Sequence, residues 1–436
     1  MILVPLNLTD ENTMILLKNC YADFVKKKVT FDNMYNYYKG NSDALSSYKM
    51  VTERSNNKVS CNFIKKFIKE EVSYSVGNDV TYVSKNSDAN IIKDIDYYLS
   101  HWSAKHDSDL AKRMLTYGFA FELYYIDKES QFSSRIITPR EGYAYTDDFG
   151  NVLFFMHIFQ KRFSTNIYID LYDDAYIYHL NNGFQEISEK TTHVFGIVPI
   201  GIAQVSAERQ DDTIYKDIKG LQDAYETNLS DISNEISDFR NAYLTFAGCE
   251  LKEEQIKDMK KLGIINLPGE KSVASWLIKN INDTFVQNTL NTLEDKMYQL
   301  SSHINHNEKM QSNLSGVALR SRLISLEEKC KLNQKAIADC IKRRLKMLFI
   351  YLKWLKGLNY DYRDIKTKFT PNIPQDDLNS AQIISQLNGK LSTETGLSLL
   401  SFVDNPQNEM EKLRREQEPN SVGQDLLNNS GTGGAA

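Results

Sequence analysis

The sequence predicts an α+β fold, in which long helices and an antiparallel sheet occupy separate stretches of the chain. Three observations carry this prediction: helical spacing of apolar residues near the N-terminus, a two-residue period between residues 135 and 205, and long amphipathic helices beyond residue 208. At 436 residues the chain is too long for one hydrophobic core to be the default. We therefore expect several domains.

Composition and charge limit the classes of protein to consider. Hydrophobic residues at 41% and charged residues at 25% are ordinary for a folded protein, and the formal net charge of -5 argues against tight binding of nucleic acid over the whole surface. Five widely spaced cysteines without a CxxC pair fit reduced, buried thiols. The N-terminal "MILVPLNLTD" lacks a basic region and a cleavage site, so neither secretion nor a membrane span is expected.

The first part of the chain is expected to be mainly helical. Between Thr9 and Lys39, apolar residues such as Leu17 and Phe24 recur at helical spacing. Residues 56–84 begin as an amphipathic helix and change to strand-like alternation near Gly77. Residues 107–127 repeat this plan, with a helix that ends near Gly118 and a strand that follows it.

Between residues 135 and 205 the pattern predicts an antiparallel sheet. Turn residues separate the alternating stretches at Asp147-Asp148, Asp173-Asp174 and Asn181–Gly183, because Asp, Asn and Gly tolerate the backbone angles of a tight reversal. Tyrosines alternate with aliphatic residues along these stretches. We interpret this pattern as a half-buried sheet face rather than as a platform for stacking bases.

The second half is expected to consist mostly of long helices. A long amphipathic helix follows residue 208, a short strand and a Pro-Gly turn come next, and a second helix covers 284–302. The polar stretch 303–320 precedes a third helix, 321–356, which contains ten Lys and Arg but only three acidic residues. A strand and a further helix follow, and the Gly-, Ser- and Asn-rich end is expected to be mobile.

No group of residues predicts catalysis, a cofactor or a metal. His303 and His306 lack the further ligands that a zinc site needs, and "GIINLPGEKS" breaks the spacing of a phosphate loop. The fragment "DDFG" is interpreted as a turn, because the other kinase motifs are missing. Paired acids such as Glu70-Glu71 are interpreted as a solvated helix face. A scaffold, a binder or a conduit is therefore favoured over an enzyme.

A series of segments runs through nearly the whole chain in a distinctive order. They are "YYKG" (37–40), "NNKVSCNFIKKFIKEEVSYSVGNDVTY" (56–82), "YGFAFELYYID" (117–127), "ITPREGYAYTDD" (137–148), "FGIVPI" (195–200), "ERQDDTIYKDIKGLQDAYETNLSDISNEISDFRNAYL" (208–244), "SGVALRSRL" (315–323) and "LSTETGLSLLSFVDNPQNEMEKLRREQ" (391–417). This series resembles tailed-bacteriophage portal proteins, of the type common in phages of Gram-positive bacteria.

The resemblance implies a portal fold that assembles as a ring, usually of twelve copies, with a mixed helical and antiparallel-sheet wing, long stem helices, a small α/β clip and a helical crown. It divides the chain into a wing (1–205), a stem helix (206–231), a clip (232–283), a second stem helix (284–302), a tunnel loop (303–320), a long wing helix (321–357), a crown (358–417) and a disordered tail (418–436).

By the same resemblance the chain is a head-tail connector at a unique capsid vertex of the virion, assembled in the host cytoplasm. Double-stranded DNA would pass through its channel during packaging and ejection. The expected partners are other copies of the chain, a terminase, a head-completion adaptor, and the major capsid and scaffolding proteins, with no membrane. The alternative is a phage structural adaptor or a baseplate component without a role as a DNA channel.

The tunnel loop supplies the candidate site residues, because a loop that faces DNA without adhering to it should be polar and flexible. They are His303, Asn305, His306, Asn307, Lys309, Gln311, Ser312 and Asn313. Lys309 is the candidate for a sparse ring of positive charge, to which the two histidines would contribute below neutral pH. Arg343, Arg344 and Lys346 of the basic helix face either packaged DNA or, as we favour, acids of a neighbouring subunit.

Overall fold

Helix α1 (Glu11–Lys39) shows how local sequence sets the bounds of an element. The Asp10 carboxylate accepts a hydrogen bond from the Thr13 N–H at its start, and Gly40 ends it at a φ of 92°, a backbone angle that glycine adopts at little cost. In the computed structural model, the described residues are 6–49, 55–239, 243–248, 253, 271–277, 283–305, 316–370, 377–387, 389–400, 403 and 405–417.

The predicted α+β class is confirmed, with helices and antiparallel strands in the order that the sequence indicated. The helices that follow α1 in the first part are α2 (Asp43–Ser47), α3 (Phe63–Val76), α4 (Ala89–Leu99) and α5 (His106–Tyr117). Strand β1 (Thr81–Ser84) follows α3, and β2 (Phe119–Ile126) follows α5, as the change of period near the two glycines predicted.

The antiparallel region forms two sheets rather than the single sheet that we predicted. A three-stranded sheet has the order β3 (Phe132–Ile137), β2, β9 (Ile200–Gln204). A five-stranded sheet follows the chain order through β4 (Gly142–Thr146), β5 (Val152–Gln160), β6 (Ile167–Tyr172), β7 (Tyr176–Asn181) and β8 (Glu186–Thr192). The sheet divides because β2 pairs with β3 on one side and with β9 on the other, at Phe121↔Ile137 and Phe121↔Ile202.

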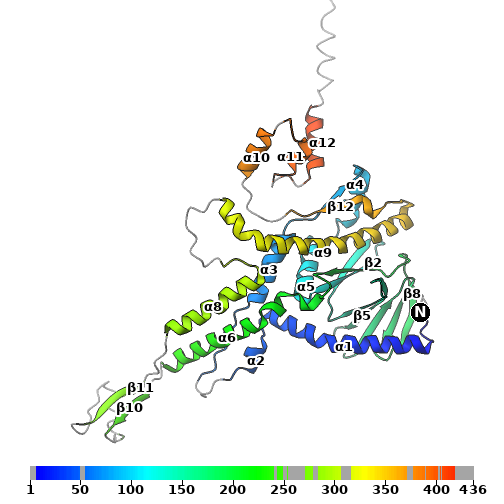
Figure 1. Ribbon diagram of the computed structural model, residues 1–436. Helices are drawn as coiled ribbons and strands as arrows, with labels where there is room; N and C mark the ends of the chain where they lie inside the picture. The colour runs from blue at the N-terminus through cyan, green and yellow to red at the C-terminus, as the bar shows by residue number, and fades with distance from the viewer. Residues whose placement is uncertain are drawn as a thin grey trace, which may run out of the picture.

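Two hydrophobic cores hold these layers together. The larger core joins α3, α5, the three-stranded sheet and the C-terminal part of the long helix α9 (Gly316–Lys356). The smaller core lies between the first half of α1 and one face of the five-stranded sheet, where Leu17 and Phe24 meet Phe154 and Leu171. Figure 1 shows α1 lying along the five-stranded sheet and α9 crossing over the three-stranded one.

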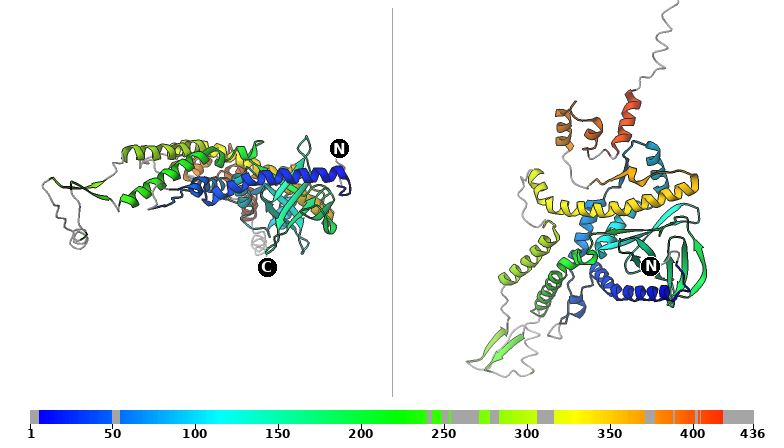
Figure 2. Two further views of the ribbon diagram at one scale, coloured as in Figure 1. Left: turned by 90° about the horizontal axis from the view of Figure 1, so that it is seen from below. Right: turned by 45° about the vertical axis from the view of Figure 1, so that its right-hand side comes forward.

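Two long helices extend away from the sheets as a pair. Helices α6 (Ile214–Phe239) and α8 (Asp283–Ser301) lie side by side, and the two-stranded sheet of β10 (Tyr243–Ala247) and β11 (Val273–Leu277) lies beyond their far end (Figures 1 and 2). The 3-10 turn η1 (Arg209–Asp211) precedes α6. Helix α6 therefore continues to residue 239, whereas the sequence boundary of the first stem helix was 231.

The remaining elements lie on the other side of α9. Turn η2 (Tyr362–Asp364) leads to β12 (Ile365–Lys368), which pairs with β1. Helices α10 (Asp377–Gln386), α11 (Thr393–Leu397) and α12 (Pro406–Gln417) follow. The expected tail, 418–436, lies outside the described residues. Within the described part of the chain, no helix is both long and apolar enough to span a bilayer.

Candidate functional site

The polar segment 303–320 joins the end of α8 to the start of α9. The structure describes residues 303–305, and it places residues 316–320, which we expected in the loop, in the first turns of α9. Asn305 is partly buried, with its Nδ2 atom 3.5 Å from Oδ1 of Asp295. The other candidate residues lie outside the described part of the chain: His306, Asn307, Lys309, Gln311, Ser312 and Asn313.

His303 lies inside the subunit, so the expectation that its side chain contacts DNA is corrected. The imidazole stacks on the ring of Phe67 in α3, with 4.3 Å between ring centroids, and its side chain has no exposed surface. Its nitrogens lie 2.8 Å from the Ser301 carbonyl oxygen and 3.2 Å from that of Phe67. Burial, assisted by the charge of Lys329, lowers the pKa of His303 to about 3, so the ring is neutral at pH 7.

A buried carboxylate next to His303 links α3 to α9. Glu71 is fully buried, although we predicted a solvated face for Glu70-Glu71, and burial raises the pKa of its carboxyl group. Lys329 Nζ lies 2.9 Å from Glu71 Oε1, and the Asn333 amide donates a hydrogen bond of 2.8 Å to Oε2. The helical period of α3 places Glu71 on its buried side, because Phe67 and Ile68 lie one turn before it.

The start of the polar segment and an inner turn of α9 are thus attached to the same helix, α3. Lys329 Nζ also donates to the carbonyl oxygen of Ser301, at 3.2 Å, near the last turn of α8. A cation is favourable at this position because the C-terminal end of a helix carries partial negative charge. The Lys329 ammonium therefore connects α8, α3 and α9 at a single point, beside the position where the polar segment leaves α8.

Arg344 fixes the middle of α9 to α5 and β2. Its side chain is 2% exposed, and its guanidinium lies 2.6 Å from Asp107 and 2.9 Å from Glu122. His106 Nε2 lies 2.7 Å from the same Glu122 carboxylate. Burial alone would raise the pKa of Glu122, but Arg344 and His106 lower it to about 2. Arg344 pairs with acids of its own subunit, so both of our alternatives, DNA and a neighbouring subunit, are wrong for this residue.

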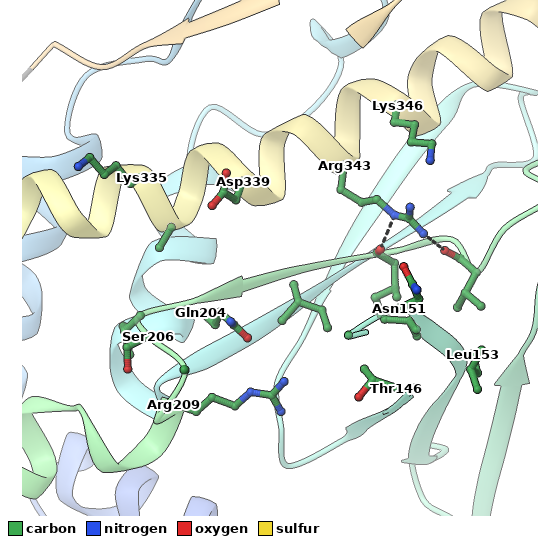
Figure 3. Close-up of a pocket in the computed structure, with 18 of the residues that line it drawn as sticks. Thr146, Asn151, Leu153, Gln204, Ser206, Arg209, Lys335, Asp339, Arg343 and Lys346 are labelled. Atoms are coloured by element: carbon green, nitrogen blue, oxygen red, sulfur yellow. Dashed lines mark hydrogen bonds between the residues drawn. The ribbon is translucent and has the colours of Figure 1, made fainter. Parts of the chain in front are cut away.

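Arg343, the preceding residue, points into a groove between α9 and the sheets (Figure 3). Its guanidinium donates hydrogen bonds of 3.1 Å to the carbonyl oxygens of Ile200 and Val198, at the start of β9. Lys346 lines the same groove, which has a volume of about 1070 Å³. The guanidinium of Arg343 is thus also hydrogen-bonded within its own subunit. An arginine that binds phosphate needs these N–H groups for the phosphate oxygens.

A ladder of buried polar side chains runs along α6, and the sequence analysis missed it. Its members are Gln222, Glu226, Ser230 and Asn234, which recur at every fourth position and are all fully buried. They hold the extended segment that precedes α3: Glu226 accepts from the Cys61 N–H at 2.8 Å, and Asn234 accepts from the Asn57 N–H at 2.6 Å. The signal was the polar period of four beside the apolar stripe, which we interpreted as surface.

The described residues contain no gathering of three or more His, Cys, Asp or Glu side chains that could hold a metal ion. Cys20, Cys330 and Cys340 are buried thiols, as predicted, whereas Cys61 is partly exposed and Cys249 lies outside the described residues. The region combines a fixed start of the polar segment at the end of α8, a long helix α9 held by the ion pairs of Lys329 and Arg344, and a polar ladder along α6.

Comparison of the sequence with known protein families identifies the family of the chain. The family described as phage portal protein, SPP1 Gp6-like, matches residues 17–422, which is most of the chain. The chain belongs to this portal protein family. Membership gives it a structural role as a portal component of a bacteriophage particle.

Individual relatives agree with this portal assignment. The chain is 22% identical to the portal protein of Bacillus phage SPP1 over 91% of this chain and 81% of that protein. It is 24% identical to the portal protein of Clostridium phage phiCD119 over 52% of this chain and 49% of that protein. A solved chain from the neck of an empty GTA particle is 12% identical, with a TM-score of 0.51 over 83% of this chain and 94% of that chain, and so shares the fold of this portal protein.

Proposed function

We propose that twelve copies of the chain form a ring at one vertex of the capsid, and that double-stranded DNA passes through the ring during packaging and ejection. The observation that carries this proposal is the portal family match over residues 17–422. In this assembly residues 1–205 form the wing, 206–231 and 284–302 the two stem helices, 232–283 the clip, 303–320 the tunnel loop, 321–357 the long wing helix and 358–417 the crown.

Exposed apolar side chains on the long helices support assembly with other copies. Ile236 on α6 is 58% exposed, Leu300 on α8 is 56% exposed and Leu332 on α9 is 60% exposed. Large apolar side chains distributed in this way over projecting helices favour contact with a partner, because burial of each one removes apolar surface from water. A ring supplies that contact on both sides of every subunit.

Charge and composition suit the polar segment to a channel that does not retain DNA. Each cation that contacts phosphate adds affinity, and therefore resistance to movement, so a conduit should be acidic or neutral with few cations. Twelve chains of net charge -5 carry about -60. Since His303 is buried and neutral, Lys309 remains the candidate cation of the loop, beside the polar residues Asn305, Asn307, Gln311, Ser312 and Asn313.

The energy for DNA movement comes, in this proposal, from a partner. The sequence has no phosphate-loop spacing, so we assign ATP hydrolysis to a terminase that docks on the clip, and a head-completion adaptor then occupies the same surface. Scaffolding and major capsid proteins contact the ring during assembly in the host cytoplasm. We propose that the ring lies at a capsid vertex of the virion. We infer no enzymatic activity for the chain itself.

Deletion of residues 305–313 tests the role of the loop. We expect this deletion to leave ring assembly intact, because the Lys329 and Glu71 anchor lies outside it, and to reduce the length of packaged DNA or its retention. A deletion of equal length at the C-terminus, residues 428–436, is the control. Normal genome length and normal infectivity in the loop deletion would contradict the proposed role of the loop.

A further inference from the structure

A second surface, outside the stem and the loop, has the form of a docking site. The groove beside Arg343 is lined by apolar side chains of β9, β5 and α9, among them Ile202, Val152 and Ala336. Its volume of about 1070 Å³ would admit several side chains. Figure 3 shows α9 along one side of the groove, with β9 and the β4–β5 region opposite. Charged residues of both signs surround this apolar floor.

The groove also exposes an unpaired strand edge. Among the described strands, β9 lies at the edge of its sheet, next to β2. Because Val205 N–H bonds to Gly118 and the Pro199 carbonyl accepts from Tyr124, the alternation of an antiparallel strand turns the backbone of Ile202 and Gln204 away from β2. Arg343 covers the neighbouring carbonyl of Ile200. The backbone N–H and C=O groups of Ile202 and Gln204 are therefore directed away from β2 and can hydrogen-bond to a partner in the groove.

Asp174 is an acidic residue of the groove whose carboxylate could pair with a cation. Asp174, in the turn between β6 and β7, lines the groove, and its Oδ1 atom is inaccessible to water and has no hydrogen-bond partner among the described residues. Burial and the adjacent Asp173 raise the pKa of the Asp174 carboxyl group. A cationic side chain brought into the groove would relieve this unfavourable position.

The turn between β5 and β6 carries an apolar side chain and two cations, which complement the apolar floor and the acid of the groove. Phe163 at this turn is 96% exposed, with a φ of 65°, and it follows Lys161 and Arg162. The turn is held by its own hydrogen bonds, from Ser164 N–H to the Lys161 carbonyl and from Gln160 Nε2 to the Thr165 carbonyl. An aromatic side chain is thus held in water at a tip that also carries two cations, in a conformation already ordered for binding.

The turn and the groove lie at opposite ends of the same strands. Val152 at the start of β5 lines the groove, whereas Phe163 follows the end of β5 at Gln160. Seen from below, the strands of the sheets run across the long axis of the subunit and project beyond the helices on both sides (Figure 2, left). Two complementary patches on opposite sides of one subunit are the arrangement that a head-to-tail ring contact requires.

We infer that the Lys161–Thr165 turn of one subunit docks into the β9 groove of the next, with Phe163 on the apolar floor and Lys161 or Arg162 near Asp174. This inference rests on the proposed ring, and it names the wing contact between adjacent copies. Phe149 provides a matched comparison, because it is 92% exposed at the β4–β5 turn, beside the groove of its own subunit rather than at the opposite end.

Disulfide trapping tests the contact directly. The double variant Phe163→Cys with Ile202→Cys should form covalent chains of several subunits in the assembled particle upon mild oxidation, and each single variant should give none. Phe149→Cys with Ile202→Cys is the control and should yield no ladder of linked subunits. Absence of linkage in a particle that images as a ring would overturn the docking inference and leave the proposed function intact.

Assembly measured by mass photometry provides a second test that does not depend on cysteine chemistry. We expect Phe163→Ser to shift the concentration for half-assembly upward at least tenfold, and Tyr97→Ser, at a 71% exposed aromatic of α4 that does not line the groove, to leave it within twofold of the wild type. Circular dichroism verifies that both variants are folded. Equal assembly of the two variants would overturn the inference, whereas a wild-type chain that stays monomeric would instead contradict the proposed ring.

Discussion

Lys329 Nζ lies 2.9 Å from Oε1 of the fully buried Glu71 and 3.2 Å from the carbonyl oxygen of Ser301. Through these two contacts the first part of α9 is joined to α3 and to the end of α8. The polar segment that follows α8 therefore leaves the fold at a fixed point.

Removing the Lys329 charge should destabilise the subunit. In Lys329→Met the Glu71 carboxylate loses its partner while it stays buried, and we expect a loss of about 2–4 kcal/mol in the free energy of unfolding, below the upper end for buried pairs because Lys329 is partly exposed. Chemical denaturation of the variant and the wild type measures this difference in the free energy of unfolding. The control Lys331→Met removes an exposed lysine of the same helix, and the double variant Lys329→Met with Glu71→Gln should recover most of the loss.

His303 should make stability fall on acidification. Its pKa is about 3 in the folded chain and about 6.5 in the unfolded chain, so its contribution is fully present above pH 6.5 and is lost as the pH falls towards 3. The slope from this group is at most about 1.4 kcal/mol per pH unit. His303→Gln should flatten the pH profile between 6.5 and 3, whereas Gln131→Ala, a control at an exposed residue without a titratable group, should leave it unchanged. Identical profiles for His303→Gln and the wild type would refute the buried, neutral assignment.

Arg344→Met should cost about 3–5 kcal/mol, because it leaves Glu122 and Asp107 without their shared cation in the interior. Thermal unfolding at neutral pH, followed by circular dichroism, measures the effect. Lys342→Met is the control, since Lys342 is exposed and contacts only the exposed Asp339 among the ion pairs of the described chain. A loss below about 1 kcal/mol in Arg344→Met would mean that Arg344 does not fix α9 to α5 and β2.

Asn234→Ala should loosen the segment before α3 without unfolding α6. Asn234 binds both the N–H and the carbonyl oxygen of Asn57, and the loss of these buried hydrogen bonds should cost about 1–3 kcal/mol. Hydrogen exchange should accelerate in residues 55–61. The control Asn228→Ala removes only a bond to the Ala224 carbonyl of the same helix, and exchange in residues 55–61 should then stay slow.

The sequence predicted the helices and strands well where one period extended over many residues. The apolar stripes of α1, α6 and α9 and the alternation through β4–β8 had this property, and each of these elements is present. The division into two sheets was missed because β2 precedes the alternating region and pairs with strands distant in the chain. Strand order of this kind depends on tertiary packing, which local periodicity does not record.

The site was harder to predict than the fold, for a reason that Glu71, His303 and Arg344 share. Each is a polar residue that we interpreted as exposed, and each is buried with partners from distant parts of the chain. A charge at a helix position is usually solvated, and only the identity of the facing helix reveals the exception. In α6 the polar period of four from Gln222 to Asn234 was visible in the sequence, but its burial was not, because a solvated helix face has the same period.

The central claim is that copies of this chain close into a ring around an open passage lined by the 303–320 segment. Electron microscopy of the purified particle, viewed along its axis and combined with its mass, tests this claim most directly. We predict an annulus with an open centre and a mass near 600 kDa, as expected for twelve chains of 50.2 kDa. A stable 50.2 kDa monomer at high concentration, or a closed particle with this segment on its outer rim, would contradict it.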